Sequence, residues 1–123
     1  MSALTPEKIA GYRRHARERE AERQLALERR KAQAWAAARL AATVLKAEYG
    51  ATRVILFGSL AHGAWWHEDS DVDLAAEGIP SDRFWRAWGA VERLAPGIEI
   101  NLAPLETVKS SIRRSIAAEG VDL

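Results

Sequence analysis

The chain has 123 residues, of which 48% are hydrophobic and 28% charged, a composition typical of one globular domain rather than of a two-domain enzyme. It contains no cysteine, which excludes disulfide scaffolds, cysteine zinc sites and thiol nucleophiles, so a metal would need carboxylates, histidines or phosphates as ligands. No apolar run approaches the roughly 18 residues of a membrane span, and residues 1–11 lack the apolar stretch of a secretory signal. We therefore expect a cytoplasmic protein that does not contact a membrane.

The formal net charge of +1 hides an uneven distribution of charge. Residues 1–50 carry 11 basic and 6 acidic side chains, whereas residues 51–104 carry 4 basic and 8 acidic ones. Basic and acidic residues are interleaved along residues 13–31, which is more typical of a solvated, ion-paired helix than of a nucleic-acid patch. The sequence therefore predicts that nucleic acid is not the partner of this region.

The first predicted element is one long helix. Thr5 followed by Pro6 is a favourable helix start, the strong helix formers Ala, Arg, Glu, Leu and Lys dominate as far as Tyr49, and Gly50 is placed to end the helix. Its length would be about 65 Å, roughly twice the diameter of a small domain. We therefore divide the chain into a helical extension, residues 1–49, and a domain, residues 50–123.

The two halves of this helix differ in pattern. Apolar residues recur at helical spacing in the second half, at Ala37, Leu40, Ala41, Val44 and Leu45, and predict packing on the domain. The first half is mostly charged, so its stability must come from ion pairs or from another protein. A homo-oligomer formed through this helix is one expectation, and a different protein partner is the other.

Shorter elements follow Gly50. Residues 54–57, 71–75 and 98–103 have the apolar or alternating pattern of strands, and the last of these puts Glu99 and Asn101 on one face. A helix over residues 81–94 is expected to begin at Ser81 and to pack through an apolar side formed by Phe84, Trp85, Trp88 and Val91. A final helix is expected over residues 108–116. The fold class is α/β (α+β), a small mixed sheet of three to four strands with helices and a long N-terminal helical extension.

The candidate site combines a glycine-serine turn with two acids. Gly58 and Ser59 directly follow a predicted strand, and a flexible turn leading into a helix can bind phosphates. Asp71 and Asp73 stand two apart on a strand, so both carboxylates point to one face and would repel each other without a cation such as Mg²⁺. We add Ser70, beside the first aspartate, as a candidate phosphate ligand. This combination predicts phosphoryl or nucleotidyl transfer.

The stretch from Gly58 to Leu74 resembles the Gly-Ser and Asp-x-Asp signature of the polymerase-beta-type nucleotidyltransferase superfamily, in particular its minimal nucleotidyltransferases, and the resemblance extends over residues 49–123. It implies a nucleotidyltransferase sheet that uses ATP and one or two Mg²⁺ ions. The metal ligands would be Asp71 and Asp73, and the turn at Gly58 and Ser59 would hold the triphosphate. It also implies that the protein acts as an antitoxin, transferring AMP to a tyrosine hydroxyl of a HEPN toxin.

The chain departs from the family pattern at one position. A third carboxylate is expected on the next strand, but the position that lines up best is Asn101, which cannot ionise. Glu99 lies on the same strand face, roughly 6.5–7 Å away along the strand. Both are therefore candidate catalytic residues, and the alternative function is a weakly active or inactive binding module that neutralises its partner by contact.

Other interpretations are weaker. Transfer to a small hydroxylated molecule such as an aminoglycoside would need a second substrate-binding domain. His62 and His67 with Glu68 and Asp69 lack the spacing of a helical metal pair, so a structural role is favoured. Trp65 and Trp66, in a predicted loop, could stack on a base or contact a partner, whereas Trp85 and Trp88 are expected to pack in the core.

Overall fold

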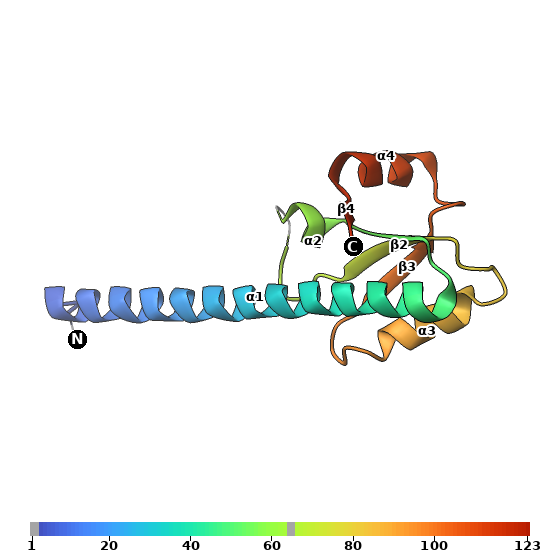
Figure 1. The fold of residues 1–123 in the computed structure, drawn as a ribbon. Coiled ribbons are helices and arrows are strands. Elements are labelled where there is room, and N and C mark those ends of the chain that lie inside the picture. The colour runs from blue at the N-terminus through green and yellow to red at the C-terminus, as the bar shows by residue number, and fades with distance from the viewer. Residues whose placement is uncertain (1–2, 64–65) are drawn as a thin grey trace.

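The computed structural model describes residues 3–63 and 66–123 and contains one four-stranded mixed sheet (Figure 1). The helices are α1 (Pro6–Tyr49), α2 (Ser59–His62), α3 (Phe84–Glu92) and α4 (Ser110–Glu119), and the strands are β1 (Arg53–Phe57), β2 (Val72–Glu77), β3 (Ile100–Pro104) and β4 (Val121–Asp122). The strand order is β3-β2-β1-β4, with β1 antiparallel to both β2 and β4, and β2 parallel to β3. Helices α1 and α3 cover one face of the sheet and α4 covers the other. The predicted fold class is confirmed.

Helix α1 begins and ends where its capping residues predict. The Thr5 hydroxyl accepts a hydrogen bond from the Lys8 N–H at 3.2 Å, and Pro6 occupies the first turn. Gly50 ends the helix with a φ of 81°, a left-handed conformation that favours glycine. The helix is therefore specified locally at both ends.

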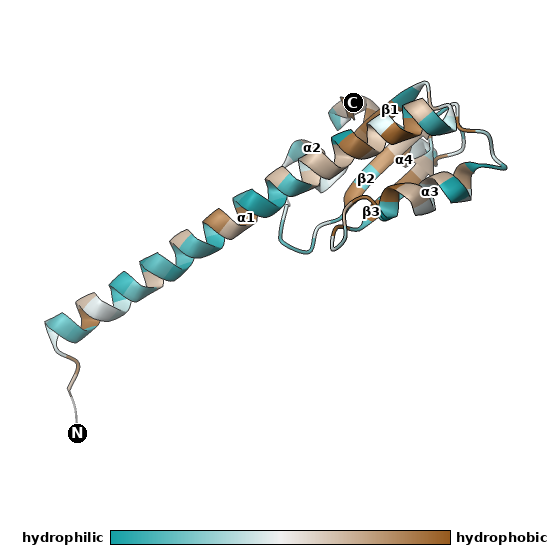
Figure 2. Cartoon of the chain, turned by 60° about the horizontal axis from the view of Figure 1, so that its bottom comes forward, coloured by the Kyte–Doolittle hydropathy of each residue, from teal (hydrophilic) through white to brown (hydrophobic). Residues whose placement is uncertain are grey.

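Only the second half of α1 packs on the sheet. Ala34, Ala38, Ala41 and Leu45 are fully buried against it, whereas most of residues 6–31, which we call the arm, are exposed. Hydrophilic residues dominate the arm and hydrophobic residues the packed half (Figure 2). Leu40 was predicted to pack but is 47% exposed, because the buried stripe runs through the alanines on the opposite side of this turn. The long helix thus reaches beyond its own domain.

Alternation along the strands divides the core between the two faces of the sheet. Val54 and Leu56 of β1 pack with α1 and α3, whereas Ile55 between them packs with Ile116 of α4. In β2, Leu74 joins the α1 side. The α1 side holds most of the buried apolar residues, so this side carries most of the stability of the domain.

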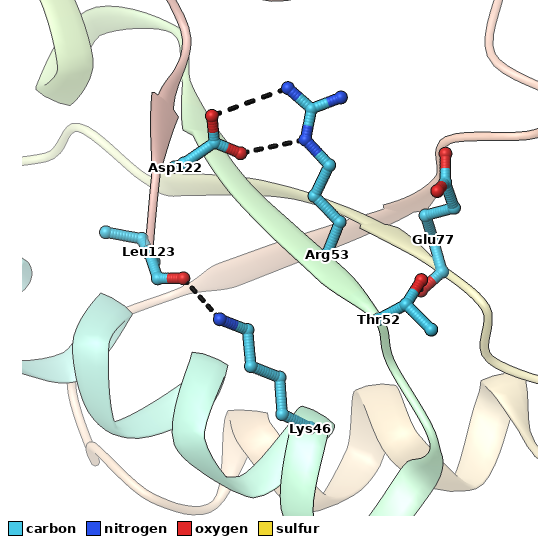
Figure 3. A network of polar contacts seen from close by, with 6 residues as sticks. All are labelled: Lys46, Thr52, Arg53, Glu77, Asp122 and Leu123. Carbon is cyan, nitrogen blue, oxygen red and sulfur yellow. Dashed lines mark hydrogen bonds and ion pairs between the residues drawn. The ribbon is translucent and has the colours of Figure 1, made fainter.

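Strand β4 is held by polar contacts as well as by its pairing with β1 (Figure 3). The Arg53 guanidinium donates to both carboxylate oxygens of Asp122, at 2.8 and 3.4 Å, and lowers the pKa of that carboxyl. Lys46 Nζ of α1 donates to the Leu123 carbonyl at 2.5 Å. The Arg53 pair holds β4 on β1, and the Lys46 bond ties the end of the chain to the packed half of α1.

Helix α3 differs from the prediction in two respects. It begins at Phe84, because residues 81–83 form a turn in which the Arg83 N–H donates to the Pro80 carbonyl, so Ser81 is not its cap. Trp85, expected in the core, is 75% exposed, because the buried side of the helix is centred on Ala87 and Val91, well over 90° around the axis from Trp85. The prediction for Trp85 was therefore wrong, whereas Trp88 does pack against the core.

Candidate functional site

The predicted acids lie where β2 and β3 begin, side by side in the sheet. Parallel pairing places Asp73 opposite Asn101, and the Val72 N–H donates to the Glu99 carbonyl at 2.9 Å. Because side chains alternate along both strands, the side chains of Asp71, Asp73, Glu99 and Asn101 share one face. The register therefore gathers all four predicted catalytic residues.

Asn101 joins the two aspartates directly. Its Nδ2 lies 3.3 Å from Asp71 Oδ2 and 3.4 Å from Asp73 Oδ1, and donates to both. A neutral amide donor between two carboxylates offsets part of their repulsion without supplying a full positive charge. Asn101 therefore links the two aspartates at this edge of the sheet.

The pKa values of two carboxyls are displaced upward at this site. Burial raises the pKa of Asp73 most strongly, the Asn101 hydrogen bond lowers it, and the charge of Asp71 raises it. The pKa of the exposed Glu99 is raised chiefly by the charge of Asp71 and by a hydrogen bond to that carboxylate. The Glu99 carboxyl is therefore close enough to Asp71 for their charges to interact, and it shares a strand face with Asn101.

Gly58 brings the predicted phosphate turn into contact with these acids. Its φ of +77° is left-handed, and a Cβ at this position would collide with Asp73 Oδ2. Ser59 begins α2 directly afterwards, and Leu60 is buried in the core, which anchors the turn. A glycine is therefore required both by the backbone conformation and by the approach of the Asp73 carboxylate.

Ser70 has a structural contact of its own. Its side chain is buried, its hydroxyl accepts a hydrogen bond from the His67 N–H at 2.9 Å, and its own N–H donates to the His67 carbonyl at 3.0 Å. This pair of bonds shapes the loop that leads into β2. Ser70 therefore lies beside the acids, but its hydroxyl already braces the loop.

The remaining candidates lie around the same loop. His67 Nδ1 accepts from the Asp69 N–H at 3.2 Å, and His62 lies 4.0 Å from Glu119. Across residues 3–63 and 66–123, no group of three or more His, Cys, Asp or Glu side chains is arranged to hold a metal. Trp66 packs partly against the core, and Trp65 lies outside the described residues.

The sequence analysis missed one residue that supports the site. The Trp88 indole N–H donates to the Ile100 carbonyl at 2.7 Å, and this bond fixes the backbone of β3 next to Asn101. The spacing of the tryptophans on α3 indicated packing but gave no signal for this bond, because its acceptor is a backbone atom on a different element.

The donor set fits a divalent cation of the Mg²⁺ type. Asp71 and Asp73 share one strand face with Glu99, and carboxylate oxygens are ligands that Mg²⁺ prefers. Asn101 presents its Nδ2 to the aspartates, so its amide would have to turn to offer its oxygen to a cation. The raised pKa of Asp73 shows that the arrangement disfavours the bare negative charge, which a cation would compensate. Because two aspartates supply only part of an octahedral shell, the remaining ligands would be water and phosphate oxygens.

The chain is similar to known nucleotidyltransferases. A family model described as a nucleotidyltransferase domain matches residues 38–123. A solved chain assigned as a minimal nucleotidyltransferase is 29% identical, over 79% of this chain and 95% of that chain, with a TM-score of 0.54. No match was found among curated proteins.

Two toxin–antitoxin structures have a similar fold. One, determined with AMP-PNP, is 19% identical over 66% of this chain and 67% of that chain, with a TM-score of 0.56. The other, MntA-HepT, is 14% identical over 72% of this chain and 69% of that chain, with a TM-score of 0.54. Within the described part of this chain, no helix is long and apolar enough to cross a membrane.

Proposed function

Because this chain belongs to the nucleotidyltransferase domain family, we propose that it transfers a nucleoside monophosphate, AMP from ATP, to a hydroxyl group of a partner protein. The observation that carries the proposal is the contact between the Gly58 turn and the Asp73 carboxylate. It puts a backbone turn suited to phosphates directly beside acids suited to Mg²⁺. A nucleotide held by the turn would therefore present its phosphates to the acids.

Each residue has a distinct part in this proposal. Asp71 and Asp73 would hold one or two Mg²⁺ ions, which supply charge neutralisation and alignment of the attacking and leaving oxygens when bound. The backbone of Gly58 and Ser59 binds the triphosphate. Glu99, which lies close to Asp71 and has a raised pKa, accepts the proton of the attacking hydroxyl. Asn101 keeps the two aspartates in position.

The proposed partner is a toxin. Two solved structures of similar fold are of toxin–antitoxin proteins, and one of them was determined with AMP-PNP. Together with the resemblance to minimal nucleotidyltransferases, this supports an antitoxin that modifies a HEPN toxin on a tyrosine. The protein would act in the cytoplasm, where ATP and Mg²⁺ are both present.

The test combines the purified chain with the protein encoded beside its gene. Both are incubated with Mg²⁺ and each labelled nucleoside triphosphate in turn, and the intact mass of each protein is measured. We expect the partner to gain the mass of one nucleoside monophosphate, with ATP preferred. Asp71→Asn with Asp73→Asn should abolish the gain, whereas the exposed Asp82→Asn should retain it. Transfer by the double variant would overturn the proposal.

A second function is supported by Asn101. Its amide donates to both aspartates and so occupies the place of a base with a group that cannot accept a proton. A site with this substitution could bind Mg-ATP without efficient transfer, and the protein would then neutralise its partner by contact. Under this function Glu99 does not replace the missing carboxylate.

Asn101→Asp separates the two functions. If Glu99 serves as the base, Asn101→Asp should change the transfer rate less than tenfold and Glu99→Gln should reduce it by about 10²–10⁴. If the protein is a binding module, the wild type should not transfer, the double aspartate variant should still neutralise the partner, and Asn101→Asp should create measurable transfer. ATP affinity, measured by calorimetry in each variant, checks that the nucleotide site is intact.

A further inference from the structure

The arm leaves the domain at the same end of the sheet as the candidate site. Arg30 of α1 donates through its guanidinium to the carbonyl of Gly97, the residue at the turn before β3, and Lys31 lies near Gly63 at the end of α2. N-terminal to Arg30, the helix projects past this end of the sheet (Figure 1). The family model begins at residue 38, so the arm is an addition to the matched domain.

Helical geometry shows which face of the arm continues the buried stripe. Eleven residues complete about three turns, so residues 11 apart lie on nearly the same face. Stepping back 11 residues from buried Ala34, Ala38 and Ala41 reaches Arg23, Leu27 and Arg30. A second step reaches Tyr12, Ala16 and Arg19. The arm therefore presents these residues on the same side as the sheet.

This sheet-side face is basic and has an apolar row. The same steps from Ala42 add Glu20 and Lys31, so the face has four basic residues and one acid, and Glu20 is already paired with Arg23 at 3.3 Å. Tyr12, which is 62% exposed, and Ala16 lie about one turn apart, and Leu27 lies about three turns beyond them; we call these three residues the apolar row. The rest of the arm is nearly balanced, with five basic and four acidic residues. Interleaved charges in the sequence thus become a basic face in the helix.

We propose that the sheet-side face of the arm binds an acidic amphipathic helix of a partner protein. Acidic side chains of the partner would pair with Arg19, Arg23 and Lys31, and its apolar residues would cover Tyr12 and Leu27. Arg19 makes no ion pair or hydrogen bond within the described residues and is available for such pairing. The partner then lies in the angle between the arm and the end of the sheet that holds the acids.

Two other occupants of this face, a second copy of the chain and a nucleic acid, fit it less well. A second copy related by a two-fold axis would set the same basic face against itself, which like charges oppose. A phosphate backbone would satisfy the arginines but would leave the apolar row of Tyr12 and Leu27 uncovered. An acidic helix with an apolar stripe satisfies both parts of the face. That the docked protein is also the acceptor rests on the proposed function, but the docking itself does not.

The test uses the full chain and a fluorescein-labelled helical peptide with glutamates on both sides of a leucine row. Arg19→Glu with Arg23→Glu should weaken peptide binding by at least about tenfold, because two attractive contacts become repulsive. The matched control is Arg14→Glu with Arg29→Glu, an equal charge change on residues that point away from the sheet side, and it should change binding less than about threefold. Tyr12→Ala should weaken binding more than Leu25→Ala does. Circular dichroism confirms that each variant keeps its helix.

Every other result overturns the inference. It fails if the peptide does not bind, or if both charge pairs weaken binding equally. Tighter binding of a labelled single-stranded RNA would instead make the face a nucleic-acid surface, and self-association in sedimentation would assign it to a second copy. Asp71→Asn with Asp73→Asn should leave peptide binding unchanged. A wild-type chain that docks the peptide but transfers nothing to the partner would contradict the proposed function alone.

Discussion

The two halves of α1 belong to one continuous helix but are stabilised by different interactions. In the packed half, small residues such as Ala34 and Ala41 let the helix lie close to the sheet, and Leu45 is fully buried. The arm buries almost nothing and holds itself by helix propensity and by local pairs such as Glu20 with Arg23. Local pairs of this kind contribute only about 0.2–0.5 kcal/mol each.

A continuous helix can therefore combine a segment that stabilises the domain with a segment that does not. The packed half can be explained by the stability of the domain, because its side chains fill the core. The arm adds little to that core, and the proposed docking of an acidic helix would give its sheet-side face a separate role. Substitutions that are chemically equal in the two regions can therefore measure the difference directly.

The greatest difference in stability should come from removing a leucine side chain in each half of α1. Leu45→Ala leaves a cavity in the core and should reduce the free energy of unfolding by about 2–5 kcal/mol. Leu25→Ala, at a position 52% exposed, should change it by less than about 0.5 kcal/mol. Urea denaturation of both variants measures the difference. Equal losses would show that the arm is packed against something in solution, which would break the contrast.

Much of the fold could be predicted because its signals are local. Thr5 and Gly50 bound α1 as expected, since capping depends on neighbouring residues alone. Ser81 failed as a cap because a turn anchored at Pro80 came first. Trp85 failed as a core residue because residue type indicates packing, whereas burial depends on which side of α3 meets the sheet.

The candidate site was only partly predictable for the same reason. The sequence brought Asp71 and Asp73 together, since two residues on one strand face need no knowledge of the fold. That Glu99 lies close to Asp71, with Asn101 bridging the aspartates, depends on the parallel register of β2 with β3. A register between distant strands is set by the whole core, and no local pattern specifies it.

A smaller difference in stability is expected between a half-buried and an exposed tryptophan of α3. Trp88 is half-buried and its indole donates to the Ile100 carbonyl, whereas Trp85 stacks on it from the exposed side with ring centroids 5.5 Å apart. Trp88→Phe should reduce the free energy of unfolding by about 1–2 kcal/mol, mainly through the lost hydrogen bond. Trp85→Phe should change it by less than about 0.5 kcal/mol. A larger loss for Trp85 in thermal or urea denaturation would reverse this assignment.

The smallest change in stability is expected at Asp73 in the candidate site, and there the substitution should stabilise the protein rather than destabilise it. Because burial raises the pKa of Asp73 above its ordinary value of 3.8, the folded state binds its proton more readily than the unfolded state does. The Asp73 carboxyl therefore destabilises the fold most at a pH at which it is ionised in both the folded and the unfolded state. Stability is lost as the pH rises through the range between the ordinary and the raised pKa. Core residues stabilise the folded state, whereas the partly buried charge of Asp73 destabilises it.

Asp73→Asn should therefore raise Tm by a few degrees at neutral pH in the absence of Mg²⁺, and the gain should shrink as the pH falls from the raised pKa to the ordinary one and vanish below it. The asparagine keeps an oxygen that can accept from Asn101, so the packing is preserved. Asp82→Asn, on the exposed surface, should give no such gain. Mg²⁺ with ATP should raise the Tm of the wild type but not of Asp73→Asn. A Tm of Asp73→Asn that lies below that of the wild type at neutral pH would show that the acids are held together for stability rather than for binding a cation.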